Sequence, residues 1–207
     1  AVLQVNDQLV DMSSSTVLPN EYNSPENILA LEQVMTAQYV RAAKVNTTLW
    51  KMYTSSDLRR SKYFNQVTVS NILVAKGGSN QYSCSFRVVE IYLNAAEAAL
   101  MTGESAIPAA RTYLLTLIKQ RYKAAAYTEK ETAINAMGRD ELLQEIYDER
   151  TRELAFEGHR WFDLRRTTRP RLEKTYSGTT YVLEENDSRY TIRIPSEAIE
   201  ANPGLAN

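Results

Sequence analysis

Three glutamates have the spacing that most directly suggests chemistry in this sequence. Glu149, Glu153 and Glu157 follow one another at intervals of four residues, so a helix would place their carboxylates on one side. By helical projection they fall on or beside the apolar arc of the segment 140–157, not opposite it. Unpaired carboxylates in such a position repel one another and are costly to bury. The pattern therefore predicts a compensating partner.

Three kinds of site would account for such carboxylates: a metal centre, a hydrolytic pair or an arginine network. Carboxylate-bridged di-iron bundles use a Glu-x-x-His pair, which is absent here, and the single histidine is His159. Glu149 and Glu153 could serve glycoside hydrolysis, one as acid and one as nucleophile or base, although spacing on one helix does not establish that geometry. We favour arginine, because bidentate Arg–carboxylate pairs suit partly buried sites.

We therefore predict a structural network of arginines and carboxylates, with at least one largely buried bidentate contact from Glu149 or Glu153. No catalytic residue, metal or cofactor is predicted. The predicted members of the network lie in the segments around residues 90, 150 and 163: Arg87, Glu90, Glu97, Glu149, Arg150, Glu153, Glu157, Arg160, Asp163, Arg165 and Arg166.

Three helices are predicted to position these side chains, over about 85–102, 105–124 and 140–157. In the first, apolar residues recur on one face with the helical period and charged residues occupy the opposite face. The short connection around Gly103 predicts that the first two helices form an antiparallel hairpin, the basic unit of tetratricopeptide-like architectures. Gly158 is expected to end the third helix.

The remaining segments carry weaker signals. Residues 1–25 look irregular, and the segment after Ser24 is interpreted as a helix or a mixed segment. Residues 49–58 predict a helix that ends in a polar turn, and the segment from Val67 to Val74 is rich in β-branched residues and is predicted to be extended. Residues 77–80 predict a loop. Beyond Pro170 the chain is expected to be mostly irregular, with at most a short β-pairing near 181–193.

Composition excludes several classes of function. The 207 residues have a formal net charge of −1, which gives no electrostatic case for binding nucleic acid. Cys84 is the only cysteine, so neither an intrachain disulfide nor a cysteine-built metal site is expected. Thirteen tyrosines against four phenylalanines are typical of wet surfaces that stack on sugars or peptides, although most such residues line core edges.

Four segments, in the same order along the chain, resemble the SusD/RagB family. Residues 87–98 resemble its "R-x-x-E-x-Y-L-x-x-A-E-A" segment, and residues 149–166 resemble its "E-R-x-x-E-L-x-F-E-G-x-R-x-x-D-L-x-R" signature. Tyr53, Asp57 and Arg59 match "Y-x-x-x-D-x-R". Residues 194–203 match "I-P-x-x-E-I-x-x-N-P", except that Ala198 stands where the pattern has Glu.

The resemblance implies a mainly α, SusD-like fold with tetratricopeptide-like hairpin packing, long irregular loops and little β structure. It implies non-catalytic capture of oligosaccharides at the bacterial outer-membrane surface, for delivery to a SusC-like TonB-dependent transporter. Peptide capture, as in RagB-like members, is the alternative. Family members are usually much longer, so residues 1–207 are expected to form the carboxyl-terminal domain. The family's amino-terminal half and lipid anchor, its only membrane attachment, are expected to lie outside this chain.

Ligand choice in this family rests on variable surface aromatic and polar side chains, which the signature motifs do not locate. The candidates in this sequence are tyrosines in predicted loops or turns. They are Tyr22, Tyr82, Tyr176 and Tyr181.

Overall fold

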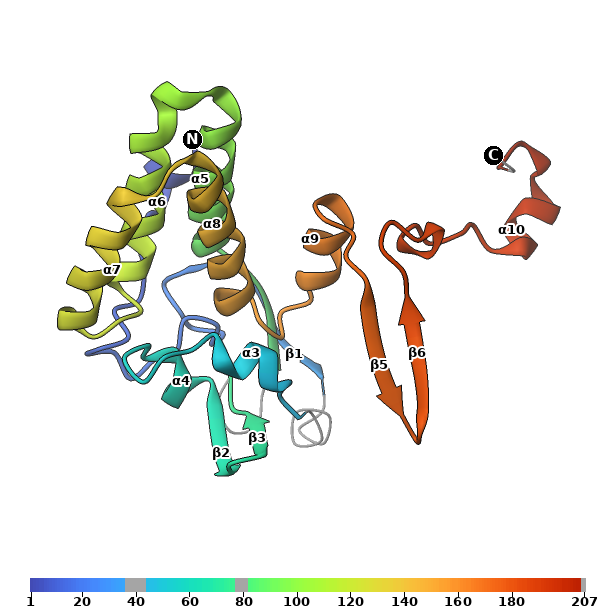
Figure 1. The fold of residues 1–207 in the computed structure, drawn as a ribbon, viewed down its shortest axis with the longest axis horizontal. Helices are drawn as coiled ribbons and strands as arrows, with labels where there is room; N and C mark the ends of the chain where they lie inside the picture. Colours follow the sequence, from blue (N-terminus) through green and yellow to red (C-terminus); the bar gives the residue numbers. More distant parts are fainter. Residues whose placement is uncertain (36–43, 77–81, 206–207) are drawn as a thin grey trace. The chain divides into compact units, whose positions relative to one another are not determined.

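The computed structural model describes residues 1–35, 44–76 and 82–205, which form two compact units, Ala1–Glu157 and Gly158–Asn207 (Figure 1). The helices of the first unit are α1 Val2–Val5, α3 Thr47–Lys51, α4 Arg59–Lys62, α5 Val88–Thr102, the 3-10 helix η1 Glu104–Ala106, α6 Ile107–Lys119, α7 Ala124–Ala136 and α8 Arg139–Glu153. Its strands are β1 Asn27–Met35, β2 Phe64–Thr68, β3 Asn71–Val74 and β4 Tyr82–Arg87.

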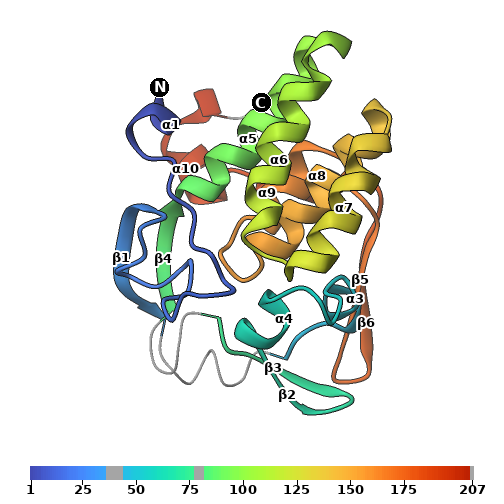
Figure 2. The same cartoon turned by 90° about the vertical axis from the view of Figure 1, so that its left-hand side faces the viewer.

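Helices α5, α6, α7 and α8 build the larger hydrophobic core of the first unit (Figure 2). Helix α5 buries Val89, Leu93, Ala96 and Leu100 completely, and this spacing forms one stripe along a helix. The stripe packs against α6 and α8, which also contact each other. Gly103, with φ of +129°, closes α5 and permits the sharp connection to η1 and α6. The predicted packing of three helical segments is thus observed, whereas the tetratricopeptide-like repeat remains a prediction.

The three helices are shorter than predicted because neighbouring segments use their ends for other contacts. Helix α5 begins at Val88, not near residue 85, since the preceding residues form β4. Helix α6 ends at Lys119, and the chain after it pairs with the turn before α4 through the Asp57–Tyr122 bridge. Helix α8 ends at Glu153, so Glu157 lies in the following turn, not on the helix.

The segment after Ser24 is a strand, which corrects the prediction of a helix or mixed segment. Ser24 only holds a local turn, in which its Oγ accepts from the Glu26 amide at 3.2 Å. Strand β1 then pairs antiparallel with β4, from Asn27 opposite Arg87 to Met35 opposite Tyr82. This pairing supplies backbone hydrogen bonds that a short isolated helix would have to make alone, so tertiary pairing overrides the local signals.

Helix α7 was not predicted, because its sequence has no clear apolar stripe: among its residues only Ile134 is buried.

The extended segment predicted over 67–74 is the antiparallel β2–β3 hairpin. A second, smaller core lies beside this hairpin and consists of Met12, Trp50, Tyr53, Tyr63, Phe64 and Ile72. The predicted loop at 77–80 lies outside the described residues.

The second unit is built around one β-hairpin. Its elements are α9 Arg160–Arg166, β5 Leu172–Tyr176, β6 Thr179–Leu183, the 3-10 helix η2 Ser188–Tyr190, α10 Ser196–Ala201 and the 3-10 helix η3 Pro203–Leu205. Ser177 and Gly178 both have positive φ, as a two-residue type I′ turn requires. The β-pairing therefore lies at 172–183, not near 181–193. Within the unit, Trp161 stacks on Tyr190 with ring centroids 5.2 Å apart.

The prediction of a mainly helical fold with little β structure is confirmed for the described residues as a whole.

Candidate functional site

A buried cluster of charged side chains occupies the centre of the first unit. We call it the charge network, and it joins segments that are far apart in sequence. Its basic members are Arg59, Lys76, Arg87, Arg121 and Arg152, and its acidic members are Glu26, Asp57, Glu149, Glu153 and Glu157. Five carboxylates and five cations balance, which is the condition under which charges are tolerated in a protein interior.

Glu153 is the centre of the network. Its carboxylate accepts hydrogen bonds from Arg59, Arg87 and Arg121, each at 3.0 Å. The Glu153 side chain and all three guanidinium groups have no exposed surface. The last turn of α8 supplies this carboxylate, while its three arginines come from α4, the end of β4 and the segment after α6. One side chain therefore ties four parts of the unit together.

Glu149 lies one helical turn earlier and shares Arg59 with Glu153. Arg59 Nη1 donates to Glu149 Oε1 at 2.6 Å, and Arg152 Nε donates to Glu149 Oε2 at 2.9 Å. Asp57 completes this side of the network. Arg59 forms a bidentate pair with its carboxylate, donating from Nε at 2.9 Å and from Nη2 at 2.8 Å. Such two-point pairs fix the orientation of both groups.

Glu26 and Glu157 close the other side of the network. Glu26 joins two arginines, accepting from Arg87 Nη1 at 2.7 Å and from Arg121 Nη2 at 2.6 Å. Arg87 also pairs with Glu157 in a bidentate fashion, through Nε at 3.0 Å and Nη2 at 2.6 Å. Lys76 donates to Glu157 and to the Glu153 carbonyl. These contacts hold the turn after α8 both at Glu153, where the helix ends, and at Glu157.

Electrostatics keeps the network carboxylates ionised. Burial by itself would raise the pKa of Glu149, but the charges of Arg59 and Arg152 outweigh it and lower that pKa to about 2. Burial acts on Glu153 in the same direction and is again outweighed, by Arg121, Arg87 and Arg59, so its pKa lies well below the usual range. Neither group holds a proton near neutral pH. A general acid for glycoside hydrolysis needs a raised pKa and access to the substrate. The geometry therefore does not support the hypothesis that Glu149 and Glu153 are a hydrolytic pair.

The structure brings together four of the predicted network residues: Arg87, Glu149, Glu153 and Glu157. The predicted segment around α8 also lines a seam with α5, where Arg150 Nη1 donates to Asn94 at 2.7 Å. In the same seam Tyr147 donates to Glu97 at 3.3 Å. Glu90 lies in the first turn of α5.

The remaining predicted members lie in α9, in the second unit. There Arg166 pairs with Asp163 at 2.9 Å in an ion pair near the surface. Arg160 and Arg165 belong to the same short helix.

Six members of the network were missed by sequence reasoning: Glu26, Asp57, Arg59, Lys76, Arg121 and Arg152. A signal was available for two of them, because Asp57 and Arg59 belong to the "Y-x-x-x-D-x-R" motif. Arg121 and Lys76 stand alone in sequence, and Glu26 lies at the start of the segment that was interpreted as a helix or a mixed segment. Their roles depend on contacts across 32 to 95 residues of chain, which no local pattern encodes.

Two of the candidate tyrosines share one face of the β5–β6 hairpin. Tyr181 stands opposite Lys174, and Tyr176 stands opposite Thr179. Because side chains alternate along a strand, Tyr176 and Tyr181 project on the same side as diagonal neighbours, about 7–8 Å apart. They are 68% and 59% exposed. On the opposite face, Thr175 and Thr180 hydrogen-bond at 3.1 Å.

The other two candidates lie in the first unit. Tyr22 is 53% exposed in the turn that leads to β1. Tyr82 begins β4, and its side chain lies outside what the structure describes.

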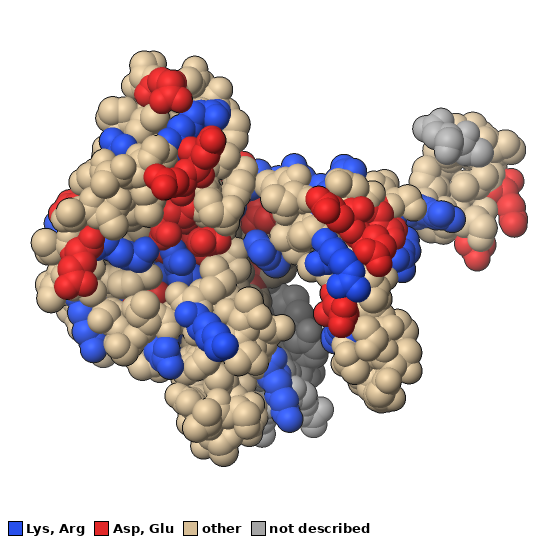
Figure 3. All heavy atoms as spheres, viewed as in Figure 1, with Lys and Arg blue, Asp and Glu red and all other residues tan. Residues whose placement is uncertain are grey.

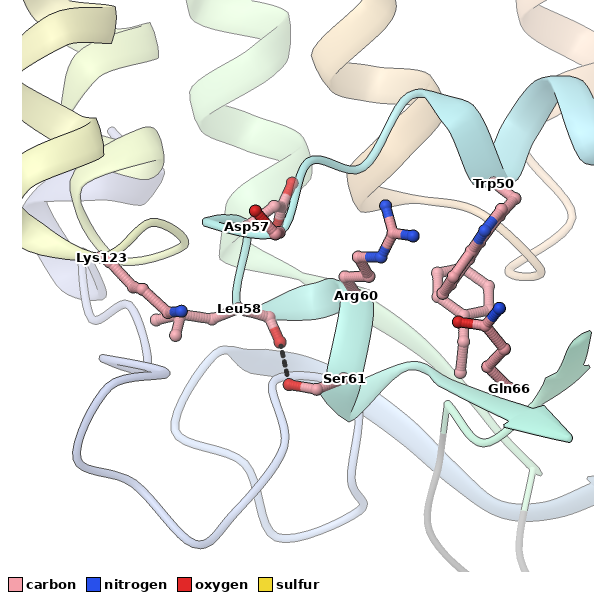
Figure 4. A pocket seen from close by; sticks show the side chains of 9 residues that line it. Trp50, Asp57, Leu58, Arg60, Ser61, Gln66 and Lys123 are labelled. Atoms are coloured by element: carbon pink, nitrogen blue, oxygen red, sulfur yellow. Dashed lines mark hydrogen bonds between the residues drawn. The ribbon is translucent and has the colours of Figure 1, made fainter. Parts of the chain in front are cut away.

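A cavity of about 430 Å³ opens in the first unit beside α3 and α4 (Figure 4). We call it the Trp50 cavity. Its lining combines two aromatic rings with basic, hydroxyl and amide groups. The lining residues are Trp50, Ser55, Asp57, Leu58, Arg60, Ser61, Phe64, Gln66 and Lys123.

Basic and acidic side chains are interspersed among the described residues on the face shown in Figure 3. Within residues 1–35, 44–76 and 82–205, no group of three or more His, Cys, Asp or Glu side chains is arranged to hold a metal ion. No helix of that part of the chain is both long enough and apolar enough to cross a membrane.

Comparison with known proteins agrees with this architecture. The model of the SusD family matches residues 14–207. A crystal structure of a SusD-like carbohydrate-binding protein from Bacteroides vulgatus superposes with a TM-score of 0.65 at 18% sequence identity. The superposition covers 99% of this chain and 53% of that one, so the chain spans about half the length of this structural relative. No curated protein matches the sequence. The match over nearly the whole chain shows that this protein belongs to the SusD family.

Proposed function

We propose that this protein captures oligosaccharides at the bacterial outer-membrane surface and passes them to a SusC-like TonB-dependent transporter. The observation that carries the proposal is the SusD-family match over residues 14–207. The structural relative from Bacteroides vulgatus, which shares the fold over 99% of this chain, is described as carbohydrate-binding. Both findings support sugar binding, and the exposed tyrosines of the β5–β6 hairpin suggest where it would take place.

The β5–β6 hairpin is the proposed sugar-binding surface. Tyr176 and Tyr181 are exposed on one face of it, and their rings can stack on the apolar faces of sugar rings while the hydroxyls remain in water. Lys174 lies on the same face, opposite Tyr181 and two residues before Tyr176 on β5, and offers a hydrogen-bond donor. A tight turn and a continuous ladder hold the pair in register, which limits the entropy lost on binding.

The protein is proposed to bind sugars without transforming them. The charge network contains the carboxylate pair that hydrolysis would need, but Glu149 and Glu153 have no exposed surface and are saturated by arginine. We propose that the network is the scaffold of the domain, not its reaction centre.

Binding should be tested on a panel of neutral and charged oligosaccharides and, side by side, of peptides. We expect saturable binding of at least one glycan, with no release of reducing sugar. Tyr176→Ala and Tyr181→Ala should each weaken it about tenfold, as loss of a central aromatic contact does. Phe162→Ala is the matched control, because Phe162 is 63% exposed but lies on α9.

Three outcomes of this experiment would count against the proposal. Selective binding of peptides would favour the peptide-capturing alternative. Sugar release by the pure protein that is lost in Glu153→Gln would show catalysis. Equal affinities of the tyrosine variants and the wild type would move the binding surface away from the hairpin.

A further inference from the structure

The Trp50 cavity is not part of the proposed tyrosine surface, and its lining has a distinct chemistry. Four segments meet there: α3, the turn and helix from Ser55 to Ser61, strand β2, and the chain after α6. The last segment is tied to the second by the backbone, since Leu58 N donates to the Arg121 carbonyl at 2.9 Å and Lys123 N donates to the Ser56 carbonyl at 3.1 Å. This pairing brings Lys123 to the cavity wall. A volume of about 430 Å³ lies within the range of small-molecule sites.

Two cations of the lining have no carboxylate partner among the described residues. The Arg60 guanidinium lies over the Trp50 ring, with its Cζ 4.1 Å from the ring centroid. Its Nη1 donates to the Tyr53 carbonyl, a neutral acceptor. Lys123 is exposed and reaches the cavity from its separate segment (Figure 4). Both positive charges are therefore available to an anion in the cavity.

The one carboxylate of the lining does not offset these charges. Asp57 has no exposed side-chain surface, and both of its oxygens are occupied by Arg59. Its negative charge is neutralised within the charge network. The surface that the cavity presents to a ligand therefore carries a net positive charge. Buried, paired charges of this kind act on their neighbours far less than unpaired ones.

The rest of the lining suits a polyhydroxylated ligand more than a simple ion. The hydroxyls of Ser55 and Ser61 and the amide of Gln66 are neutral groups of the lining, and all three residues are exposed. Ser61 Oγ donates to the Leu58 carbonyl at 3.3 Å and keeps its lone pairs for an incoming hydroxyl. Trp50 and Phe64 form an edge-to-face pair, 5.6 Å between centroids, that supplies an apolar wall.

We infer that the Trp50 cavity binds an anionic sugar, with Arg60 holding its carboxylate or sulfate ester, Lys123 attracting the negative charge from the Leu58 side of the cavity, and the serines holding ring hydroxyls. The inference rests on the proposed function and narrows it, because it makes acidic glycans the preferred class. Arg60, with its planar fork of donors fixed by the Trp50 ring, orients the acid group. Lys123 adds a mobile point charge.

The two tryptophans allow a test that locates binding. The 207-residue chain would be titrated with galacturonate, with its neutral methyl ester, with galactose 6-sulfate and with galactose, while the indole N–H signals of Trp50 and Trp161 are followed by NMR. We expect saturable shifts of Trp50 with at least one acidic sugar, weaker at high salt, and no comparable shift with the ester or galactose. The two acidic probes separate a carboxylate site from a sulfate site. Trp161, which does not line the cavity, is the internal reference.

Lys123→Gln should weaken acidic-sugar binding roughly fivefold, the effect of one partly exposed charge. Lys119→Gln, an exposed lysine on α6, is its matched control. Arg60→Gln should abolish the Trp50 shift. Because Arg60 also holds the Tyr53 carbonyl, the Lys123 variant decides the case if the Arg60 variant is unstable.

The outcomes separate this inference from the proposed function. If acid and ester shift Trp50 equally, or if Lys123→Gln binds like wild type, the inference fails while glycan capture on the hairpin stands. If the tyrosine variants lose all glycan binding and acidic sugars never shift Trp50, the cavity is not a sugar site. If no glycan of either panel binds, both proposals fail.

Discussion

Glu153 shows how a single side chain can determine the architecture of the domain. Three arginines from three separate segments converge on its carboxylate. A buried ion network adds little net stability compared with a well-packed apolar core. Removing one member, however, leaves the other buried charges without a partner, which is strongly destabilising. We therefore infer that the network contributes mainly specificity, because the observed arrangement of α4, β4, α8 and the chain after α6 gives every one of these charges a partner.

We predict that Glu153→Ala lowers the free energy of unfolding by about 3–5 kcal/mol, because three guanidinium groups lose their shared partner in a buried place. Chemical denaturation followed by circular dichroism would measure the change. Glu129→Ala, at an exposed position of α7, is the control and should change stability by less than about 0.5 kcal/mol. Glu145 is unsuitable as a control, since it is only 14% exposed and pairs with Lys130 and Arg152. Equal effects of the two substitutions would contradict the central role of Glu153.

The same network predicts sensitivity to acid. The pKa of Glu149 falls from 4.5 to about 2 on folding, so its contribution is complete above pH 4.5 and is lost as the pH falls toward 2. The shift corresponds to roughly 3 kcal/mol. Urea denaturation at a series of pH values should show this loss, and Glu149→Gln should have a flatter profile over the same interval. Parallel profiles for variant and wild type would show that Glu149 does not carry this linkage.

Among the elements, the β5–β6 hairpin is the one whose proposed role in sugar binding depends on a turn. Ser177 and Gly178 have φ of +48° and +79°, and this turn sets the register that places Tyr176 and Tyr181 on one face. A slip of one residue would send the two side chains to opposite faces.

We predict that Gly178→Ala weakens glycan binding severalfold and lowers stability by about 1 kcal/mol, because alanine is strained at positive φ. Calorimetric titration and thermal unfolding would separate the two effects. Gly138→Ala is the matched control: Gly138 has φ of −71°, and a Cβ there would meet only Glu141 at an ordinary 3.8 Å. Wild-type affinity in Gly178→Ala would show that the turn does not position the tyrosine pair.

At the scale of the whole molecule, the two units are held together internally by different means. Ala1–Glu157 contains both hydrophobic cores and the charge network. In Gly158–Asn207 the hairpin is largely exposed, and Leu164 and Tyr190 are the buried apolar residues among those described.

We therefore predict unequal protection in hydrogen exchange monitored by mass spectrometry. Amides of α5, α6 and α8 should exchange slowest, at rates set by global unfolding, because their helices bury the core stripe. Amides of β5 and β6 should exchange much faster through local opening. A ligand of the hairpin should slow the second group and leave the first unchanged. Equally slow exchange in both groups would show that the hairpin unfolds only with the core.

The sequence by itself determined the helical core, the family and the unusual position of the α8 carboxylates. Apolar periodicity and the order of four motifs are local properties, and α5, α6 and α8 appear where these patterns indicate. The inference that Glu149, Glu153 and Glu157 need cationic partners also followed from spacing and the cost of burying charge.

Only the tertiary structure decided which cations those are and which side chains meet at the proposed binding surfaces. Arg59 and Arg121 reach Glu153 from 94 and 32 residues away, and β1 replaces a predicted helix because β4 lies alongside it. The Asp57–Tyr122 bridge likewise brings Lys123 to the lining of the Trp50 cavity, whose other residues lie within 50–66. These contacts depend on geometry between elements, and the free energy that selects them belongs to the assembled core, not to any stretch of sequence.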